Sequence, residues 1–354
     1  MKLAALGGRP RLRFLIIAAL GIALIYYLLE RIGFRAVLSA AASVGWGGFA
    51  LLCLLAYLLF GLLGPAWHVL IPGNYRLPVR VFIAARMVRD GASETLPFSQ
   101  VGGMMLGVRA ANLLGVPTHL AVASMIVDVT TEMMAQIIYV VAGLLILGLG
   151  RHTAHLPLVH SLLQICVVGL LFASLGGGLF LAFQRRGLRW AIGKVTAQIL
   201  PQSVTHTAGI AAALEEIYRA PLRIVLSVGL HFCAWMGGAL STWIAFRLMG
   251  VSISVASVVA IDSIVYAMRS AAFFVPNSLG VQEAAYTTLA PLIGIGKDLG
   301  LAVSLIKRAR DIAIGIPILL IWQAAEGRRA FAARIAPLDD NTTAGAGVSD
   351  PSAP

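Results

Sequence analysis

The chain has 354 residues, of which 59% are apolar and only 12% are charged, and its mean hydropathy is +0.89. Soluble globular domains carry about 25% charged residues, so this composition excludes a soluble enzyme, a disordered regulator and a nucleic-acid-binding domain. The net charge of +12 comes from basic residues that flank apolar runs, which is typical of the topology-setting loops of membrane proteins. We therefore predict an all-α polytopic membrane protein.

Apolar runs in chain order predict seven or eight transmembrane helices, since a crossing needs about 20 such residues. A basic segment, residues 1–11, precedes the first run and is expected in the cytoplasm. An eighth crossing, by residues 276–296, would return the basic residues near the C-terminus to the cytoplasm. The seven clear runs are 12–29, 47–71, 119–150, 158–183, 222–249, 253–275 and 299–325.

Two segments, 79–116 and 276–296, are too polar or too often interrupted to be simple spans. Irregular backbone at membrane depth persists only where protein or a wet cavity satisfies its amides. We therefore predict that both segments are re-entrant or discontinuous helices. The residues that mark the breaks are Pro97, Gly102, Pro276, Asn277 and Gly280.

The two broken segments resemble each other, because each has an arginine followed by a Pro-x-Ser sequence and a glycine. Paired broken segments indicate an internal, inverted repeat with a binding site between its halves. The predicted halves are residues 12–183 and 221–326. A basic interfacial linker, 184–220, would join them, and a disordered tail, 327–354, would follow.

Charged residues gather in and beside these membrane segments, where one charge at the bilayer centre costs about 2.5–3.5 kcal/mol. We expect them to line a polar cavity for a charged or zwitterionic lipid headgroup, since arginine binds phosphate through two donors. Helix N-termini after the two prolines would add oriented amides. The expected cavity residues are Arg89, Arg109, Arg269, Arg308, Arg310, Asp90, Glu94, Asp128, Glu132, Asp262, Glu283 and Asp311.

A second interpretation is that these charges form structural ion pairs that fasten helices together. Lys307 and Asp311 are four residues apart and are expected to pair, which would leave Arg308 and Arg310 for an anion. Arg86, with Arg89 and Arg109, is near enough in sequence to serve as a counter-ion. His68 and His231 lie in apolar runs and are expected to be hydrogen-bonded core residues.

No chemistry-bearing motif is recognisable in the chain. The three cysteines each lie alone in an apolar run, so we predict neither a disulfide framework nor a zinc site. The sequence also lacks the motifs of serine hydrolases, zinc proteases and phosphate-binding loops. We expect no metal, no cofactor and no catalytic residues, and therefore no enzymatic activity.

The sequences ETLPFSQVGGMMLGVRAA (94–111) and FFVPNSLGVQEAAY (273–286) resemble the paired signatures of the lysylphosphatidylglycerol synthase transmembrane region, and are most similar to its hopanoid-biosynthesis-associated HpnL branch. The resemblance implies a helical bundle with two re-entrant helix pairs that moves a polar lipid between leaflets. Many members have Glu after the first glycine motif, whereas Met104 stands here, so an acidic role does not transfer to it. The motif positions that match are Pro97, Gly102, Arg109, Pro276, Gly280 and Glu283.

Two functions are open at this point. The first is translocation of a hopanoid or phospholipid between leaflets of the bacterial inner membrane without ATP hydrolysis, with the acids orienting the arginines or coupling transport to protons. The alternative is a membrane subunit or intramembrane enzyme of a hopanoid or polyprenyl-lipid modification pathway, or a scaffold for such enzymes. The expected partners are membrane lipids and lipid-biosynthesis enzymes, and not nucleic acid. Because the aminoacyl-transferase domain of bifunctional relatives has no counterpart here, we expect no lipid aminoacylation.

Overall fold

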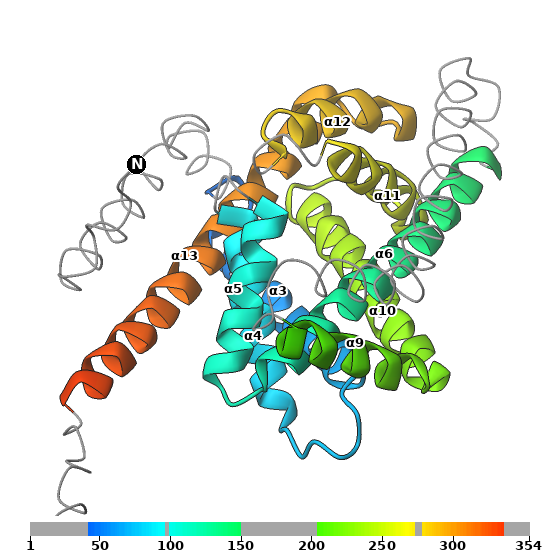
Figure 1. The fold of residues 1–354 in the computed structure, drawn as a ribbon. Helices are drawn as coiled ribbons and strands as arrows, with labels where there is room; N and C mark the ends of the chain where they lie inside the picture. Colours follow the sequence, from blue (N-terminus) through cyan, green and yellow to red (C-terminus); the bar gives the residue numbers. More distant parts are fainter. Residues whose placement is uncertain (1–41, 96–98, 150–203, 273–277, 336–354) are drawn as a thin grey trace, which may run out of the picture.

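The computed structural model describes residues 42–95, 99–149, 204–272 and 278–335, and within these ranges all regular elements are helical (Figure 1). The predicted all-α fold is confirmed. The spans expected over 12–29 and 158–183 lie outside the described residues, as do Pro97, Pro276 and Asn277. The helices are α3 (Gly45–His68), α4 (Val79–Thr95), α5 (Ser99–Leu113), α6 (Thr118–Leu149), α9 (Val204–Tyr218), α10 (Pro221–Leu248), α11 (Val255–Ala271), α12 (Val281–Leu289), η4 (Ala290–Ile293) and α13 (Lys297–Ile335).

Three of the described helices, α3, α6 and α10, are long and apolar enough to cross a membrane. They coincide with the runs predicted over 47–71, 119–150 and 222–249. Large apolar side chains such as Leu58 and Val225 are exposed on them, as expected of surfaces that face lipid. The other two predicted spans differ: α11 has only 17 residues, and α13 has 39 residues but is interrupted by charges around residue 308.

The first broken segment, 79–116, forms two helices, α4 and α5, that pack against each other. Gly103 of α5 faces Arg89 and Ser93 of α4, and a Cβ atom at Gly103 would lie 2.6 Å from the carbonyl oxygen of Arg89. Gly107, one turn further along α5, also faces Arg89. As the chain advances along α5 from Gly103 to Gly107, its contacts on α4 move back from Ser93 to Arg89, so the two helices are antiparallel, with glycine at their closest approach.

The second broken segment is also divided into short helices. α11 ends at Ala271, α12 covers nine residues, and the 3₁₀ turn η4 precedes α13. Gly280 has a φ of +80°, which favours glycine, and its N–H donates to the Glu283 carboxylate at 2.9 Å. This bond caps the N-terminus of α12, so Gly280 and Glu283 have a structural role in beginning that helix.

The element order and packing support the predicted internal repeat. A long helix, two short helices and another long helix occur twice, as α3–α6 and as α10–α13. The first helices of the two halves, α3 and α10, pack together. The second helix of each half packs on the fourth helix of the other half, α4 on α13 and α11 on α6. The halves are therefore interlocked, because each half packs its second helix on the fourth helix of the other. A two-fold repeat produces this arrangement.

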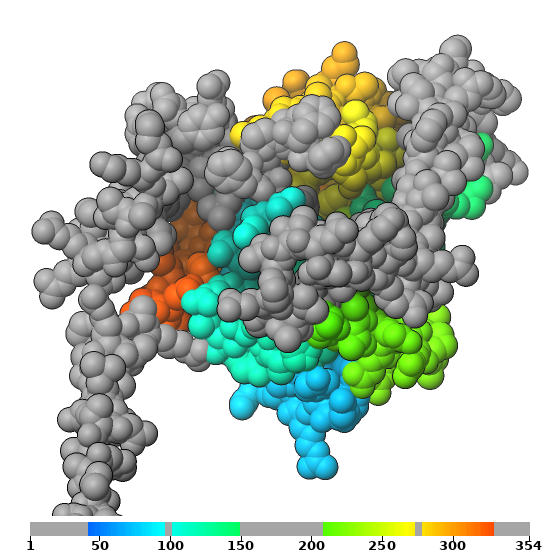
Figure 2. Space-filling view, viewed as in Figure 1, coloured from blue at the N-terminus to red at the C-terminus, as the bar shows by residue number. Residues whose placement is uncertain are grey.

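Two predicted boundaries change in the structure. Within the predicted linker 184–220, α9 packs on α6 and buries Leu214 and Ile217 in the core. At the other boundary, α13 continues to Ile335, so residues 327–335 are helical and do not belong to the predicted disordered tail. The space-filling view shows the connection between α3 and α4 protruding at one end of the molecule (Figure 2).

Candidate functional site

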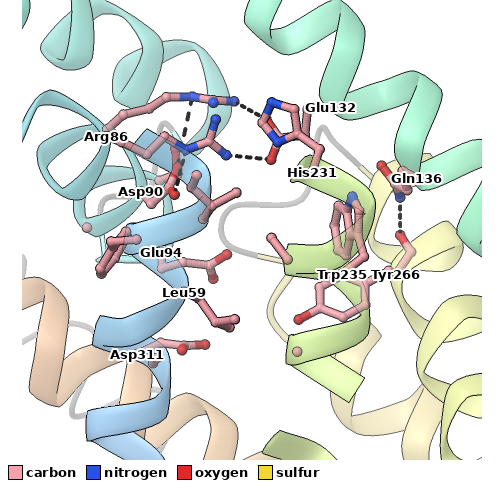
Figure 3. A pocket seen from close by; sticks show the side chains of 18 of the residues that line it. Leu59, Arg86, Asp90, Glu94, Glu132, Gln136, His231, Trp235, Tyr266 and Asp311 are labelled. Carbon is pink, nitrogen blue, oxygen red and sulfur yellow. Dashed lines mark hydrogen bonds and ion pairs between the residues drawn. The ribbon is translucent and has the colours of Figure 1, made fainter. Parts of the chain in front are cut away.

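A cavity of about 420 Å³ lies between the two halves and is lined by α3, α4, α6, α10, α11 and α13. Apolar residues line it from α3 and α10 and include Leu59, Phe60 and Trp235. In Figure 3, Asp90, Glu94 and Asp311 face Trp235 and Tyr266 across the cavity. The charged residues that line it are Arg86, Arg89, Arg269, Arg310, Asp90, Glu94, Glu132 and Asp311.

The first ion cluster joins α4 to α6. Arg86 donates to Asp90, Asp128 and Glu132 at 2.8, 2.7 and 2.6 Å. Arg89, one turn later on α4, donates to the same Asp128 and Glu132 at 3.0 and 2.7 Å. Residues three and four apart lie on one helix face, which explains why both arginines reach both acids.

His231 of α10 completes this cluster from the opposite side. Its ring is fully buried, and Nε2 lies 3.1 Å from Oδ1 of Asp128. The prediction that His231 is a hydrogen-bonded core residue is confirmed, but the residue also lines the cavity. Its other nitrogen, Nδ1, is buried without a hydrogen-bond partner among the described residues.

A second ion pair joins the two halves directly. Arg269 of α11 donates to both carboxylate oxygens of Glu94 on α4, at 3.0 and 2.8 Å. Glu94 belongs to the first broken segment, and Arg269 lies on α11, shortly before the second, so this pair joins the two halves at the cavity. Tyr266 supports the pair, since its ring centroid lies 5.4 Å from the Arg269 guanidinium carbon.

The pairing predicted within α13 is wrong. Arg310, and not Lys307, binds Asp311, at 2.7 Å. Lys307 is buried on the face of α13 toward α11, where it donates to Asp262 at 2.7 Å. Thr242 and Tyr286 satisfy its other donors at 3.0 and 2.7 Å.

The Lys307–Asp262 pair lies behind the cavity and not in it. Asp262 is fully buried and accepts hydrogen bonds from the hydroxyls of Tyr139, Thr242 and Tyr286. One cation and one anion balance here, and their remaining polar atoms are satisfied. This arrangement fits the interpretation of a structural pair that fastens α11 to α13.

Several other predicted cavity residues lie elsewhere. The Arg109 side chain is 54% exposed and pairs with Glu326 near the end of α13, at 3.0 Å. Arg308 pairs with Glu283 at 3.2 Å. Neither pair lines the cavity, and Asp128 lies beneath its surface. Of the two break-marking glycines described, Gly102 lies near the start of α5 and Gly280 caps α12.

Arg86 was expected only as a counter-ion, yet it makes the most contacts in the cluster and lines the cavity. Its position four residues before Asp90 was the available signal. Trp235 and Tyr266 were missed, and their spacing carries no signal that separates cavity residues from core residues. The described residues hold no group of three or more His, Cys, Asp or Glu side chains arranged for a metal ion.

Comparison with known proteins identifies the family to which this chain belongs. Searches of curated proteins and of solved structures found no match to the chain. The model of one family, the lysylphosphatidylglycerol synthase TM region, matches residues 12–318, which include both broken segments and all of the cavity. This match confirms the family resemblance of the two motifs. The chain therefore belongs to the lysylphosphatidylglycerol synthase transmembrane-region family and is a membrane protein of lipid metabolism or transport.

Proposed function

We propose that the protein moves a polar lipid, a hopanoid or a phospholipid, between the leaflets of the bacterial inner membrane without ATP hydrolysis and without acting as an enzyme. The observation that carries the proposal is the mixed lining of the cavity. Buried charges of both signs line it from α4, α6, α11 and α13, and apolar residues line it from α3 and α10. A lipid headgroup needs the first kind of surface and its chains need the second.

The charged side suits a headgroup that carries a phosphate. Arg269 and Arg310 are each about one-tenth exposed and each has its main carboxylate partner in the cavity. A phosphate could exchange with Glu94 or Asp311 for bidentate donation from these arginines. The released carboxylate would then bind the ammonium of a zwitterionic headgroup, so the total charge of the cavity would be unchanged.

The apolar side suits acyl chains that stay in lipid. α3 and α10 pack together and both expose large apolar residues on their outer surfaces. The part of the cavity wall that comes from α3, with Ala56, Leu59 and Leu63, carries no charge. A headgroup can therefore enter the polar region while its chains lie along these two helices, which avoids the cost of bare charge in hydrocarbon.

Leaflet exchange in liposomes tests the proposal. The purified full chain is reconstituted with fluorescent phospholipid or hopanoid, and a membrane-impermeant quencher reports exchange. Arg269→Gln should slow the exchange at least about tenfold, because about 1.4 kcal/mol of lost headgroup binding has that effect. Arg219→Gln is the matched control, since Arg219 forms an exposed pair with Glu215 away from the cavity. Wild-type protein that is folded and inserted but exchanges no lipid would contradict the proposal.

A further inference from the structure

The cluster on α4 and α6 has more negative than positive charge. Three carboxylates, Asp90, Asp128 and Glu132, face only two guanidinium groups, Arg86 and Arg89. Buried charges are stable when they are compensated and costly when they are not. With a neutral His231, this cluster keeps one uncompensated negative charge among the described residues.

The hydrogen bonding of His231 shows where a compensating proton can bind. An ionised carboxylate only accepts hydrogen bonds, so the ring nitrogen that faces Asp128, Nε2, carries the hydrogen. The neutral ring then has a bare lone pair on Nδ1. This atom is buried and has no partner among the described residues, and His231 lines the cavity.

The other groups around the ring are engaged with each other. Helix α3 contributes only apolar residues to this cavity within the described part of the chain. Asp90 is an alternative acceptor of a proton, because among the described residues only Arg86 donates a hydrogen bond to it, and Arg89 Nε is 4.0 Å away. The charged and titratable groups that the packed helices contribute to the cavity and the cluster are Asp128 and Glu132 on α6, Arg86, Arg89, Asp90 and Glu94 on α4, Tyr266 and Arg269 on α11, and Arg310 and Asp311 on α13.

We infer that Nδ1 of His231 is a proton-binding site and that its occupancy controls entry of phosphate-bearing headgroups. A proton from water adds to the Nδ1 lone pair and forms an imidazolium, while the Nε2–H bond to Asp128 stays in place. The cluster is then neutral and no longer repels an anionic headgroup. The proton returns to water from the same atom after the lipid leaves. Proton binding is therefore coupled to lipid transport, and this inference rests on the proposed function.

The test uses the full chain in liposomes with an entrapped pH-sensitive dye and labelled phosphatidylglycerol. Exchange, measured between about pH 8 and about pH 5.5, should rise as the pH falls, and proton uptake should accompany it. His231→Gln keeps an N–H donor for Asp128 but binds no proton, so its exchange should not respond to pH. His68→Gln is the matched control, because His68 bonds Leu77 outside the cavity, and it should keep the wild-type response.

The other possible outcomes test the inference and the proposed function separately. Wild-type exchange that ignores pH, or a pH response that persists in His231→Gln, would overturn the inference and leave lipid transport standing. A response lost in Asp90→Asn but kept in His231→Gln would place the proton on Asp90 and overturn it too. No exchange at any pH would contradict the proposed function. Nitrogen NMR of the His231 ring in detergent reads protonation of Nδ1 without transport or substitution, and a Nδ1 that stays bare throughout the range would overturn the inference.

Discussion

Arg86 and Asp262 occupy equivalent places in the two halves and carry opposite charges. Arg86 is the seventh residue after Val79, the start of α4, and Asp262 is the seventh after Val255, the start of α11. Their main partners are equivalent as well, because Asp128 and Lys307 are each the tenth residue after the start of α6 and α13. One buried ion pair is thus repeated with its signs exchanged.

The two ion pairs, which we call the Arg86 copy and the Asp262 copy, differ in their exposure to the cavity and in their charge balance. The Asp262 copy is sealed and balanced, while the Arg86 copy opens on the cavity and has an extra carboxylate. A sealed, balanced pair has little freedom to respond to a ligand. The open copy is therefore the one suited to bind and release charge, and the sealed copy is suited to hold α11 and α13 together.

Removal of Lys307 should destabilise the protein strongly. Lys307→Met leaves Asp262 buried and unpaired, which costs about 3–5 kcal/mol of the free energy of unfolding. Combining it with Asp262→Asn removes the unpaired charge and keeps an acceptor for the tyrosine hydroxyls, so most of the loss should be recovered. Thermal unfolding in detergent measures both. Equal stability of the single and double variants would contradict a structural role.

The ion pair of Glu94 and Arg269, which joins the two halves, should tolerate an exchange of its two charges. Glu94→Arg or Arg269→Glu alone places like charges together, and each should slow lipid exchange and lower the unfolding temperature. The double reversal restores an attractive pair and should recover stability. If charge order in the cavity also matters for the headgroup, exchange will recover less than stability does. Additive losses in the double variant would mean that the two side chains do not interact.

Close packing of α4 and α5 should make Gly103 intolerant of a side chain. Gly103→Ala puts a Cβ atom 2.6 Å from the Arg89 carbonyl oxygen, and overpacking of this kind costs about 1–3 kcal/mol. Gly229→Ala in α10 is the matched control, since a Cβ atom there meets nothing within 4 Å. In the helix interior the control should gain up to about 1 kcal/mol. Similar unfolding temperatures for the two variants would refute the predicted contact.

Filling the apolar side of the cavity should block transport without removing a charge. Ala56→Phe introduces a ring where α3 lines the cavity, so lipid exchange should fall while the unfolding temperature changes little. Leu54→Phe, on the exposed surface of the same helix, should leave exchange as in wild type. Undiminished exchange in Ala56→Phe would show that lipid takes another route.

Local sequence patterns predicted the helices better than they predicted which charged residues pair with each other. The apolar runs of α3, α6 and α10 and the break between α4 and α5 follow from hydropathy and from proline and glycine positions. The Lys307–Asp311 prediction failed because spacing along one helix cannot show which face that helix buries. In the structure, Asp262 and two hydroxyls on neighbouring helices compete successfully for the ammonium.

The sequence predicted which kinds of residue form the candidate site, but it did not predict how they are arranged in space. Charges in membrane segments indicated a polar cavity, and Arg89, Glu94 and Arg269 do line one. Arg109 was grouped with them because it lies in the same motif, but it does not line the cavity, and its exposed side chain pairs with Glu326. The role of His231 needs the position of α10 against α6, which no local pattern contains.

Helix α13 is much longer than one bilayer crossing requires. Its 39 residues span about 58 Å at about 1.5 Å per residue, against a hydrocarbon thickness of about 30 Å. It touches the cavity through Arg310 and contacts α4 at Gly315, two residues before Pro317, where the missing N–H weakens the helix. A tilt of about 10° at that point would displace its distal end by about 5 Å. Under the proposed function, a lipid that displaces α13 at the cavity would therefore also move the end of this helix far from the headgroup.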